Sequence, residues 1–350
     1  MPMLIFKAPK DILLILLLFL SILYFFKQKK HPVKLYICII FLTSFALISI
    51  ILSNHFTIIL AGIRWMLPLF LSLFLYNLVN FEFVKKVSNI LFCLLILNII
   101  LQICEMFFMP PFWGHNFLGL SGRLPGFFVH PSSSGTFSAF CCFFTAYFFT
   151  GKKRKLGIAL SALGIFLSMS STSIMLVAIL IAIPFYFKSK LKPLIIILIP
   201  LMILAVVVNL DTLTGRGEGD SELSGTTRLL ILKDFVDSSE IISTHFGVGT
   251  NSAVNLLEDS TNSNNAFIVD SLYTSVLVNL GSVFFCLFIL FNIYLITRAF
   301  EIGNNDLSFI SFILICVVAG IPVITSELFP ISLLIAILIA FYTKRYNLYY

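Results

Sequence analysis

The residues of this sequence that could do chemistry are a few charged side chains set beside long apolar stretches. Arg123 opens one such stretch, GRLPGFFVHPSSSG at 122–135, which also contains His130. A guanidinium presents a rigid fork of N–H donors that matches phosphate oxygens, and it keeps its charge at any relevant pH. Beside a lipid surface, this chemistry suits a diphosphate. The alternative is that Arg123 only extends to the membrane interface while Pro125, Gly126 and Pro131 shape a turn.

A second set of charges lies further along the chain. Arg216 and Arg228 fall in a long polar segment, and Asp270 follows it in the sequence NNAFIVDSLY at 264–273, which ends at Tyr273. A carboxylate near the end of a membrane span is costly to leave unpaired, so it is a functional candidate, here as a proton acceptor. Its alternative role is a solvated helix cap. Charges within or between apolar runs also make Arg64 and Glu327 candidates, whereas we expect Glu82 and Glu105 to have ordinary interface roles.

Several kinds of site are not indicated. There is no GxxxxGK[ST] motif, and the glycines at 215, 217 and 219 have no preceding strand, so no nucleotide is expected. The five histidines lack metal-ligand spacing, and we expect neither a metal nor another cofactor. The seven cysteines lie in apolar runs without a CxxC pair and are interpreted as packing residues.

The elements that must position these residues are membrane helices. Of the 350 residues, 59% are hydrophobic and only 11% are charged, less than half the roughly 25% of soluble domains. Apolar runs long enough to be spans predict an all-α, polytopic transmembrane bundle of about 10–12 helices forming a single integral membrane domain. The runs lie at about 12–26, 35–53, 56–79, 87–109, 136–150, 156–168, 174–187, 193–210, 266–297, 307–325 and 331–343.

Basic residues predict the orientation of these spans. Sixteen of the 23 Lys and Arg residues fall in alternate connections, at 27–34, 85–86, 152–155, 188–192, 298 and 344–345. By the positive-inside rule these connections are cytoplasmic, which predicts a multi-pass inner-membrane protein. Lys7 and Lys10 then lie on the unfavoured side, so the orientation of the first span stays open.

Two extracytoplasmic loops follow from this orientation, at 110–135 and 211–265. The larger holds nine acids against Arg216, Arg228 and Lys233. Leu229, Leu232, Phe235 and Val236 recur within it at helical spacing and predict a short amphipathic helix at the membrane surface.

The order of these parts resembles a known family. The pattern Arg-x-x-Gly-Phe-Phe-x-x-Pro-Ser at 123–132 is followed by a long external loop with arginines, an amphipathic helix and Gly-x-Gly at 247–249, and then by Asp-Ser-x-Tyr-(x)7-Gly at 270–281. This order is similar to that of the O-antigen and capsule repeat-unit polymerases of the Wzy type, and of the related O-antigen ligases, over roughly 112–281.

The resemblance implies a membrane glycosyltransferase that acts on undecaprenyl-diphosphate-linked oligosaccharides at the outer face of the bacterial cytoplasmic membrane. Arg123 and Arg228 match the family's external-loop arginines, which would engage the lipid diphosphate, and with Asp270 they are the candidates for catalysis. The candidates for substrate binding are Arg64, Arg216, His130, Tyr273 and Glu327. Its partners would be the lipid-linked oligosaccharide, membrane lipid and a chain-length regulator, with no nucleic acid. Asp270-Ser271 stands where the ligases have His-Asn, which favours a polymerase and leaves the general base open.

The sequence departs from the family at one more place. A Ser-Arg pair near a middle hairpin is replaced here by SMSSTS at 168–173, and no role is drawn from that stretch. The alternatives are a ligase-like glycosyltransferase, a lipid-linked oligosaccharide flippase, and a structural or sensory membrane protein. The flippase is disfavoured because this chain has a long external loop, which a flippase should lack. The chain also shows no duplicated halves of the kind that transporters often carry.

Overall fold

The described residues form helices, joined by turns and short irregular segments. The computed structural model describes residues 16, 19, 20, 23, 44, 71–72, 75–108, 124–128, 131–188, 237, 245, 272–303, 306–320 and 330–346. No strand occurs among these residues. Most of the predicted spans at 12–26, 35–53 and 56–79 lies outside them, as do the whole predicted span at 193–210 and the predicted amphipathic helix.

The chain divides into two compact units, which are described one by one. Unit 1 comprises Met1–Phe81, Thr226–Ile293 and Gly320–Tyr350, and unit 2 comprises Glu82–Gly225 and Tyr294–Ala319. Both include residues distant in sequence, because helices from different parts of the chain pack together within each unit.

Within the described residues, two helices are long and apolar enough to cross a membrane by length and composition. They are Phe81–Phe107, in α4 (Phe81–Phe108), and Leu280–Ile302, in α12 (Leu272–Gly303). On α4, Ile90, Leu97 and Met106 are exposed while the polar Asn98 and Gln102 are buried. An apolar exterior around polar interior groups is the reverse of a soluble helix and is typical of a helix in lipid.

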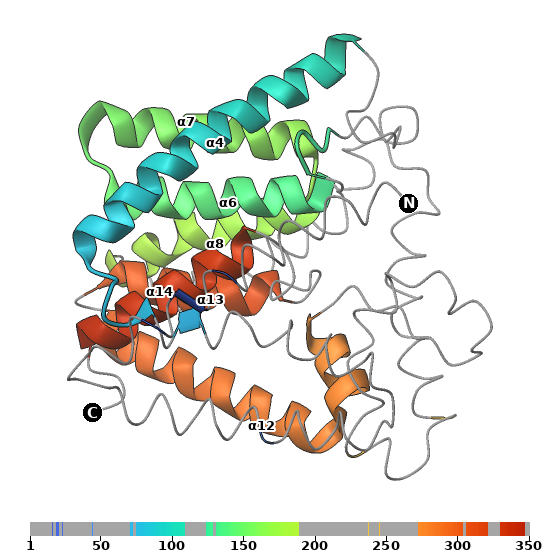
Figure 1. Cartoon of the computed structure of the whole chain (residues 1–350), viewed down its shortest axis with the longest axis vertical. Helices are drawn as coiled ribbons and strands as arrows, with labels where there is room; N and C mark the ends of the chain where they lie inside the picture. The colour runs from blue at the N-terminus through green and yellow to red at the C-terminus, as the bar shows by residue number, and fades with distance from the viewer. Residues whose placement is uncertain are drawn as a thin grey trace. The chain divides into compact units, whose positions relative to one another are not determined.

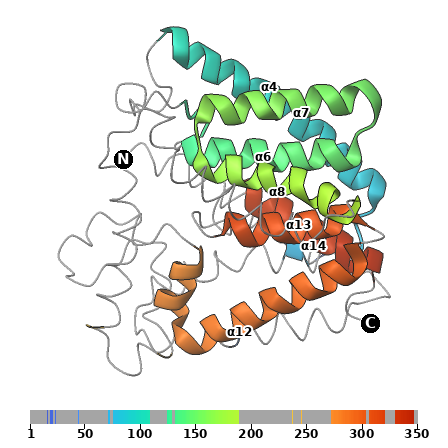
Figure 2. The same cartoon turned by 180° about the vertical axis from the view of Figure 1, so that it is seen from behind.

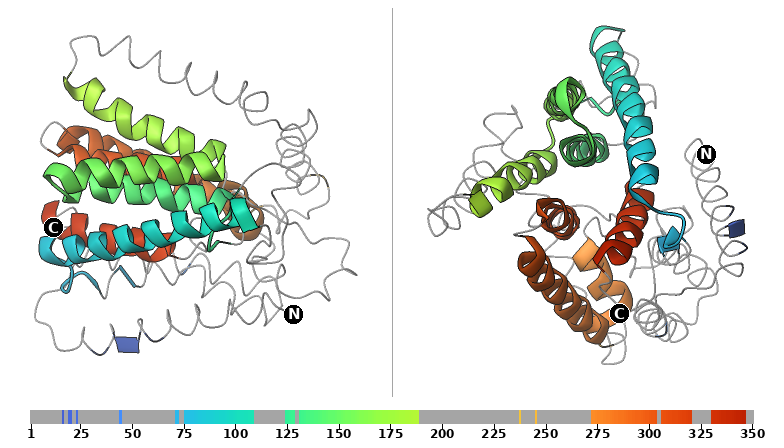
Figure 3. Two further views of the ribbon diagram at one scale, coloured as in Figure 1. Left: turned by 90° about the horizontal axis from the view of Figure 1, so that it is seen from above. Right: turned by 90° about the vertical axis from the view of Figure 1, so that its left-hand side faces the viewer.

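Three further helices of unit 2 form one group, and α4 forms hydrogen bonds with two of them, α6 and α7. α6 (Pro131–Phe148) lies between α7 (Gly151–Ser168) and α8 (Ser171–Lys188), and α4 is tilted across α6 and α7 (Figures 1, 2 and 3). α6 begins at Pro131, where the missing N–H of proline is no loss. Small residues let these helices approach closely: a side chain at Gly157 would overlap Thr145.

The end of α7 that begins at Gly151 carries basic residues. Lys153 donates a hydrogen bond to Asn89 Oδ1 at 2.6 Å and lies over the rings of Phe92 and Phe149. The first turns of α4 and α7 therefore lie at the same end of unit 2. Lys85, Lys86 and Lys152–Lys155, which the hydropathy pattern predicts to lie in connections, belong to α4 and α7. Charged residues lower the hydropathy of the first turns of α4 and α7, so an apolar run marks the start of each helix too late.

The remaining helices are α13 (Leu307–Ala319) in unit 2 and α14 (Ile331–Tyr346) in unit 1. α13 packs on α6 and α8, and Ser311 on α13 shares a 2.6 Å hydrogen bond with Tyr147 on α6. Asp306 caps the start of α13 by accepting the Ser308 N–H at 2.9 Å. In α14, Lys344 donates to the carbonyl oxygens of Asn77 and Val79.

Candidate functional site

One face of α4 carries a row of three polar side chains, Asn98, Gln102 and Glu105, which we call the polar row. Their spacing of four and three residues places them on the same side of the helix. Asn98 and Gln102 are 0% exposed and Glu105 is 6% exposed. Because burying an amide or carboxyl group is unfavourable unless it forms hydrogen bonds, each of these side chains needs partners nearby.

The partners of the polar row include the backbone of residues 124–128, which we call the anchored segment. Gln102 Nε2 donates to the Leu124 carbonyl at 2.9 Å. In return, the Gly126 N–H donates to Glu105 Oε2 at 2.9 Å and the Phe127 N–H donates to Asn98 Oδ1 at 3.2 Å. The polar row therefore fixes the path of a stretch that is neither helix nor strand.

α6 and α7 complete this junction. Asn98 Nδ2 donates to Ser134 Oγ on α6 at 2.9 Å, and Gln102 Nε2 also lies 3.2 Å from Ser134 Oγ. The Leu124 N–H donates to the Leu167 carbonyl of α7 at 3.1 Å. The anchored segment is thus held by four hydrogen bonds to α4 and α7, and the same polar row bonds to α6.

A glycine is required in the anchored segment for two reasons. Gly126 has φ +63°, in the left-handed region that disfavours residues with a Cβ. A Cβ at this position would overlap Asn98 Oδ1 and lie 3.0 Å from Gln102 Cγ. The rings of Phe127 and Phe128 then stack at 4.4 Å, and both meet Phe137 of α6. The Gly-Phe-Phe sequence therefore combines a close backbone approach with an aromatic contact.

A cluster of buried hydroxyl groups lies on the other side of the α6 start. Ser168 at the end of α7, Ser170 in the turn and Ser173 at the start of α8 surround Gly135, where a Cβ would lie 2.6 Å from Ser168 Oγ. Met169 makes this tight turn with φ 43°, and its N–H donates to the carbonyls of Ile165 and Phe166. The SMSSTS stretch thus packs against the helix that follows the anchored segment.

Unit 1 contains a second feature, a kink in α12. Gly281 has φ 78° and ψ 173°, which interrupts the helix. The next residue, Ser282, shares a 3.0 Å hydrogen bond with His245 Nδ1 from the large polar segment. Near the start of α12, the Leu272 N–H donates to the Gly320 carbonyl at 2.9 Å and the ring of Tyr273 meets Phe288.

Of the site residues predicted from the sequence, Tyr273 is the one that the structure describes. It lies in the first turn of α12, half-buried, eight residues before the Gly281 kink. The other predicted site residues lie outside the described part of the chain: Arg64, Arg123, His130, Arg216, Arg228, Asp270 and Glu327.

The polar row belongs to none of the sequence motifs, so the motifs do not predict it. Asn98 and Gln102 were not singled out, and the expectation of an ordinary interface role for Glu105 is wrong, because its carboxylate is buried and accepts a backbone N–H. A signal was present in the sequence: three polar residues on one face of a run that is otherwise apolar. Such residues face the interior of a bundle and pair there.

Among the described residues, no group of three or more His, Cys, Asp or Glu side chains is placed to hold a metal ion. Comparisons of the chain with protein-family models, with curated proteins and with solved structures found no match. The class that the fold defines is a helical protein that has, in the part of the chain the structure describes, two helices long and apolar enough to cross a membrane.

Proposed function

We propose that this protein is a membrane glycosyltransferase of the repeat-unit polymerase type. It would move a growing glycan from undecaprenyl diphosphate onto a hydroxyl group of a new lipid-linked repeat unit. The observation that supports this most is the anchored segment, because it forms the centre of the Arg-x-x-Gly-Phe-Phe pattern and directly follows Arg123. A segment held this firmly is a suitable base for a cation that must meet a diphosphate at a fixed point.

The kink of α12 gives further support. Gly281 is the last residue of the Asp-Ser-x-Tyr-(x)7-Gly pattern, and its φ of 78° explains why a glycine stands there. The kink also joins the patterned helix to the large polar segment through His245 and Ser282. Each of the two sequence patterns thus contains a glycine, Gly126 or Gly281, whose positive φ disfavours any other residue.

The proposed reaction is a substitution at the anomeric carbon of the donor glycan. The acceptor hydroxyl oxygen forms a bond to this carbon while the bond from the carbon to the diphosphate oxygen breaks, and the diphosphate leaves with the electron pair. Arg123 and Arg228 would stabilise the charge that develops on the leaving diphosphate. Asp270 would accept the hydroxyl proton. Transfer to lipid A core in place of a new repeat unit would make the protein a ligase.

The test uses purified full-length protein in detergent, supplied with a lipid-linked repeat unit, and measures product length on a gel. Arg123→Ala should abolish chain growth, and Arg123→Lys should retain part of it, because Lys keeps the charge but loses the two-pronged hydrogen bonding. Arg154→Ala is the matched control, since this exposed arginine lies in α7 at the basic end of unit 2.

Asp270→Asn should reduce the rate by about 10²- to 10⁴-fold, the usual effect of removing a positioned base. Normal ladders from Arg123→Ala and Asp270→Asn at normal abundance would overturn the site assignment. Failure of the wild-type protein to join lipid-linked units, with transfer to lipid A core instead, would replace the polymerase with a ligase.

A further inference from the structure

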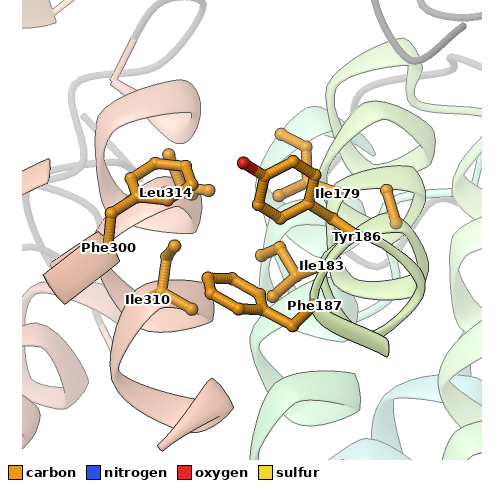
Figure 4. A pocket seen from close by; sticks show the side chains of 8 residues that line it. Ile179, Ile183, Tyr186, Phe187, Phe300, Ile310 and Leu314 are labelled. Atoms are coloured by element: carbon orange, nitrogen blue, oxygen red, sulfur yellow. The ribbon is translucent and has the colours of Figure 1, made fainter. Parts of the chain in front are cut away.

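An apolar cavity of about 310 Å³ lies within unit 2, between α8, α12 and α13. Figure 4 shows the α8 side chains on one wall facing those of α12 and α13 on the other. The side chains that shape it are hydrocarbon apart from one tyrosine hydroxyl: Ile183, Tyr186 and Phe187 on α8, Phe300 on α12, and Ile310 and Leu314 on α13. A site of this kind does not hold water, because water needs polar partners.

The cavity is large for a packing defect. Protein interiors are packed like organic crystals, with few voids larger than a water molecule. An engineered apolar cavity of about half this volume is known to bind small hydrocarbons. The volume instead falls at the lower end of the roughly 300–1,000 Å³ range of ligand pockets. The volume and the apolar lining therefore suit a hydrocarbon ligand.

The position of the cavity along the helices is well defined. Its α8 wall covers the last nine residues before Lys188, about 13 Å of helix. Phe300 lies three residues before the end of α12, and Ile310 and Leu314 lie in the first two turns of α13. The cavity therefore occupies the end of these helices that the positive-inside rule assigns to the cytoplasm.

The surroundings of the cavity match a phospholipid on both counts, tail and headgroup. Ile181, beside the α8 wall, is 57% exposed, so the adjoining surface is apolar. A basic residue lies near this end of two of the helices: Arg298 is half-exposed on α12 beside Glu301, and Lys188 is the last residue of α8. Basic residues next to an apolar site at the cytoplasmic side attract anionic headgroups.

We propose that this cavity binds one acyl chain of an anionic phospholipid from the cytoplasmic leaflet. The headgroup phosphate would lie near Lys188 at the end of α8 and Arg298 on α12. This lipid is distinct from the proposed substrate, because the anchored segment lies against the opposite end of the bundle, where α8 begins at Ser171. α8 alone separates the two ends by about 27 Å. The inference holds whatever reaction the protein performs.

The experiment uses the full-length protein in nanodiscs that contain phosphatidylglycerol with a photoactivatable diazirine in its acyl chain. After illumination, the labelled peptides are identified by mass spectrometry. We expect labels on the peptides of α8 and α13 that line the cavity, and we expect unlabelled phosphatidylglycerol to compete better than phosphatidylcholine with the same acyl chains. Equal competition by the two lipids would overturn the headgroup preference, and absence of label from these peptides would overturn the site.

Ala182→Phe tests the cavity directly, because Ala182 lies on its wall. The ring would fill space used by the chain, so labelling should fall by about tenfold or more, as expected when several methylene groups lose their burial. Ile181→Phe is the matched control, since the neighbouring residue points to the exposed side. Equal labelling of Ala182→Phe and wild type would refute the proposal.

Two further arms keep the result interpretable. Ala182→Leu fills less space and serves if Ala182→Phe does not give a monodisperse protein, with a smaller loss of labelling expected. Undecaprenyl phosphate is added as a competitor to wild type. If it displaces the photolipid better than phosphatidylglycerol does, the cavity is a site for the polyprenyl substrate and the phospholipid proposal is wrong.

Discussion

The two ends of unit 2 are built differently and by different helices. At one end, the polar row of α4 bonds to the anchored segment and to α6, so that position is set by directional hydrogen bonds. At the other end, α8, α12 and α13 meet through hydrocarbon side chains and leave a cavity. Hydrogen bonds fix atoms to within a few tenths of an ångström, whereas apolar contacts only require that space be filled. The first end is suited to holding a loop still, and the second to accepting a flexible chain.

The largest effect should come from adding one methyl group at the hydrogen-bonded end. Gly126→Ala combines left-handed strain with overlap of the polar row, so it should destabilise the protein by about 2–4 kcal/mol, measured by SDS titration in mixed micelles. Gly151→Ala is the control, because Gly151 has φ +58° but nothing within 4 Å of its added Cβ. It should cost only the strain, about 1–2 kcal/mol. Equal effects would mean that the close approach to α4 is unimportant.

An intermediate effect should follow from removing one hydrogen-bonding group from the polar row. Gln102→Met keeps the length of the side chain but leaves the buried Leu124 carbonyl without its donor, which should cost about 1–3 kcal/mol in the same titration. Ile103→Met, on the exposed side of the same helix, should change stability by less than about 0.5 kcal/mol. If both variants behave alike, the hydrogen bonds do not determine this end of the unit.

The smallest effect should appear at the cavity. Ala182→Leu adds volume where space exists, so it should change stability by less than about 1 kcal/mol in lipid-free micelles. Ala139→Leu adds the same volume in α6, where Ala139 is 0% exposed, and should destabilise by about 1–3 kcal/mol. A large loss in Ala182→Leu would show that the cavity wall tolerates no added volume, and the contrast between the two ends would fail.

The sequence was a good guide to the helices. Apolar runs at 87–109, 174–187 and 331–343 correspond to α4, α8 and α14, because hydropathy reports burial in a bundle or in lipid. The predicted boundaries are wrong at the helix ends. α6 begins at Pro131 and not near 136, because serine and proline can start a helix although they are not apolar. α13 ends at Ala319 and not at 325.

The candidate site was harder to predict. Sequence motifs consist of charged and patterned residues, so they identify the Gly-Phe-Phe and Gly281 positions. They do not identify the side chains of the polar row, which bond to the Gly-Phe-Phe backbone. Gln102 and Ser134 are 32 residues apart and meet only because α4 and α6 pack together. Sequence alone gives the polarity of one helix face, but the partner of that face depends on how the helices are arranged.

The bond from Lys344 also has a consequence for the order in which the protein matures. Lys344 reaches the carbonyl of Asn77 across 267 residues, and it reaches Val79 as well. A ribosome that adds about 5–20 residues per second needs roughly 13–53 s to cover this separation. During that interval the carbonyls of the Asn77–Val79 turn lack their final donor, so the turn just before α4 is completed after most of the chain has been synthesised. Unit 1 therefore closes late, whereas the helices from α4 to α8 can pair as soon as they emerge.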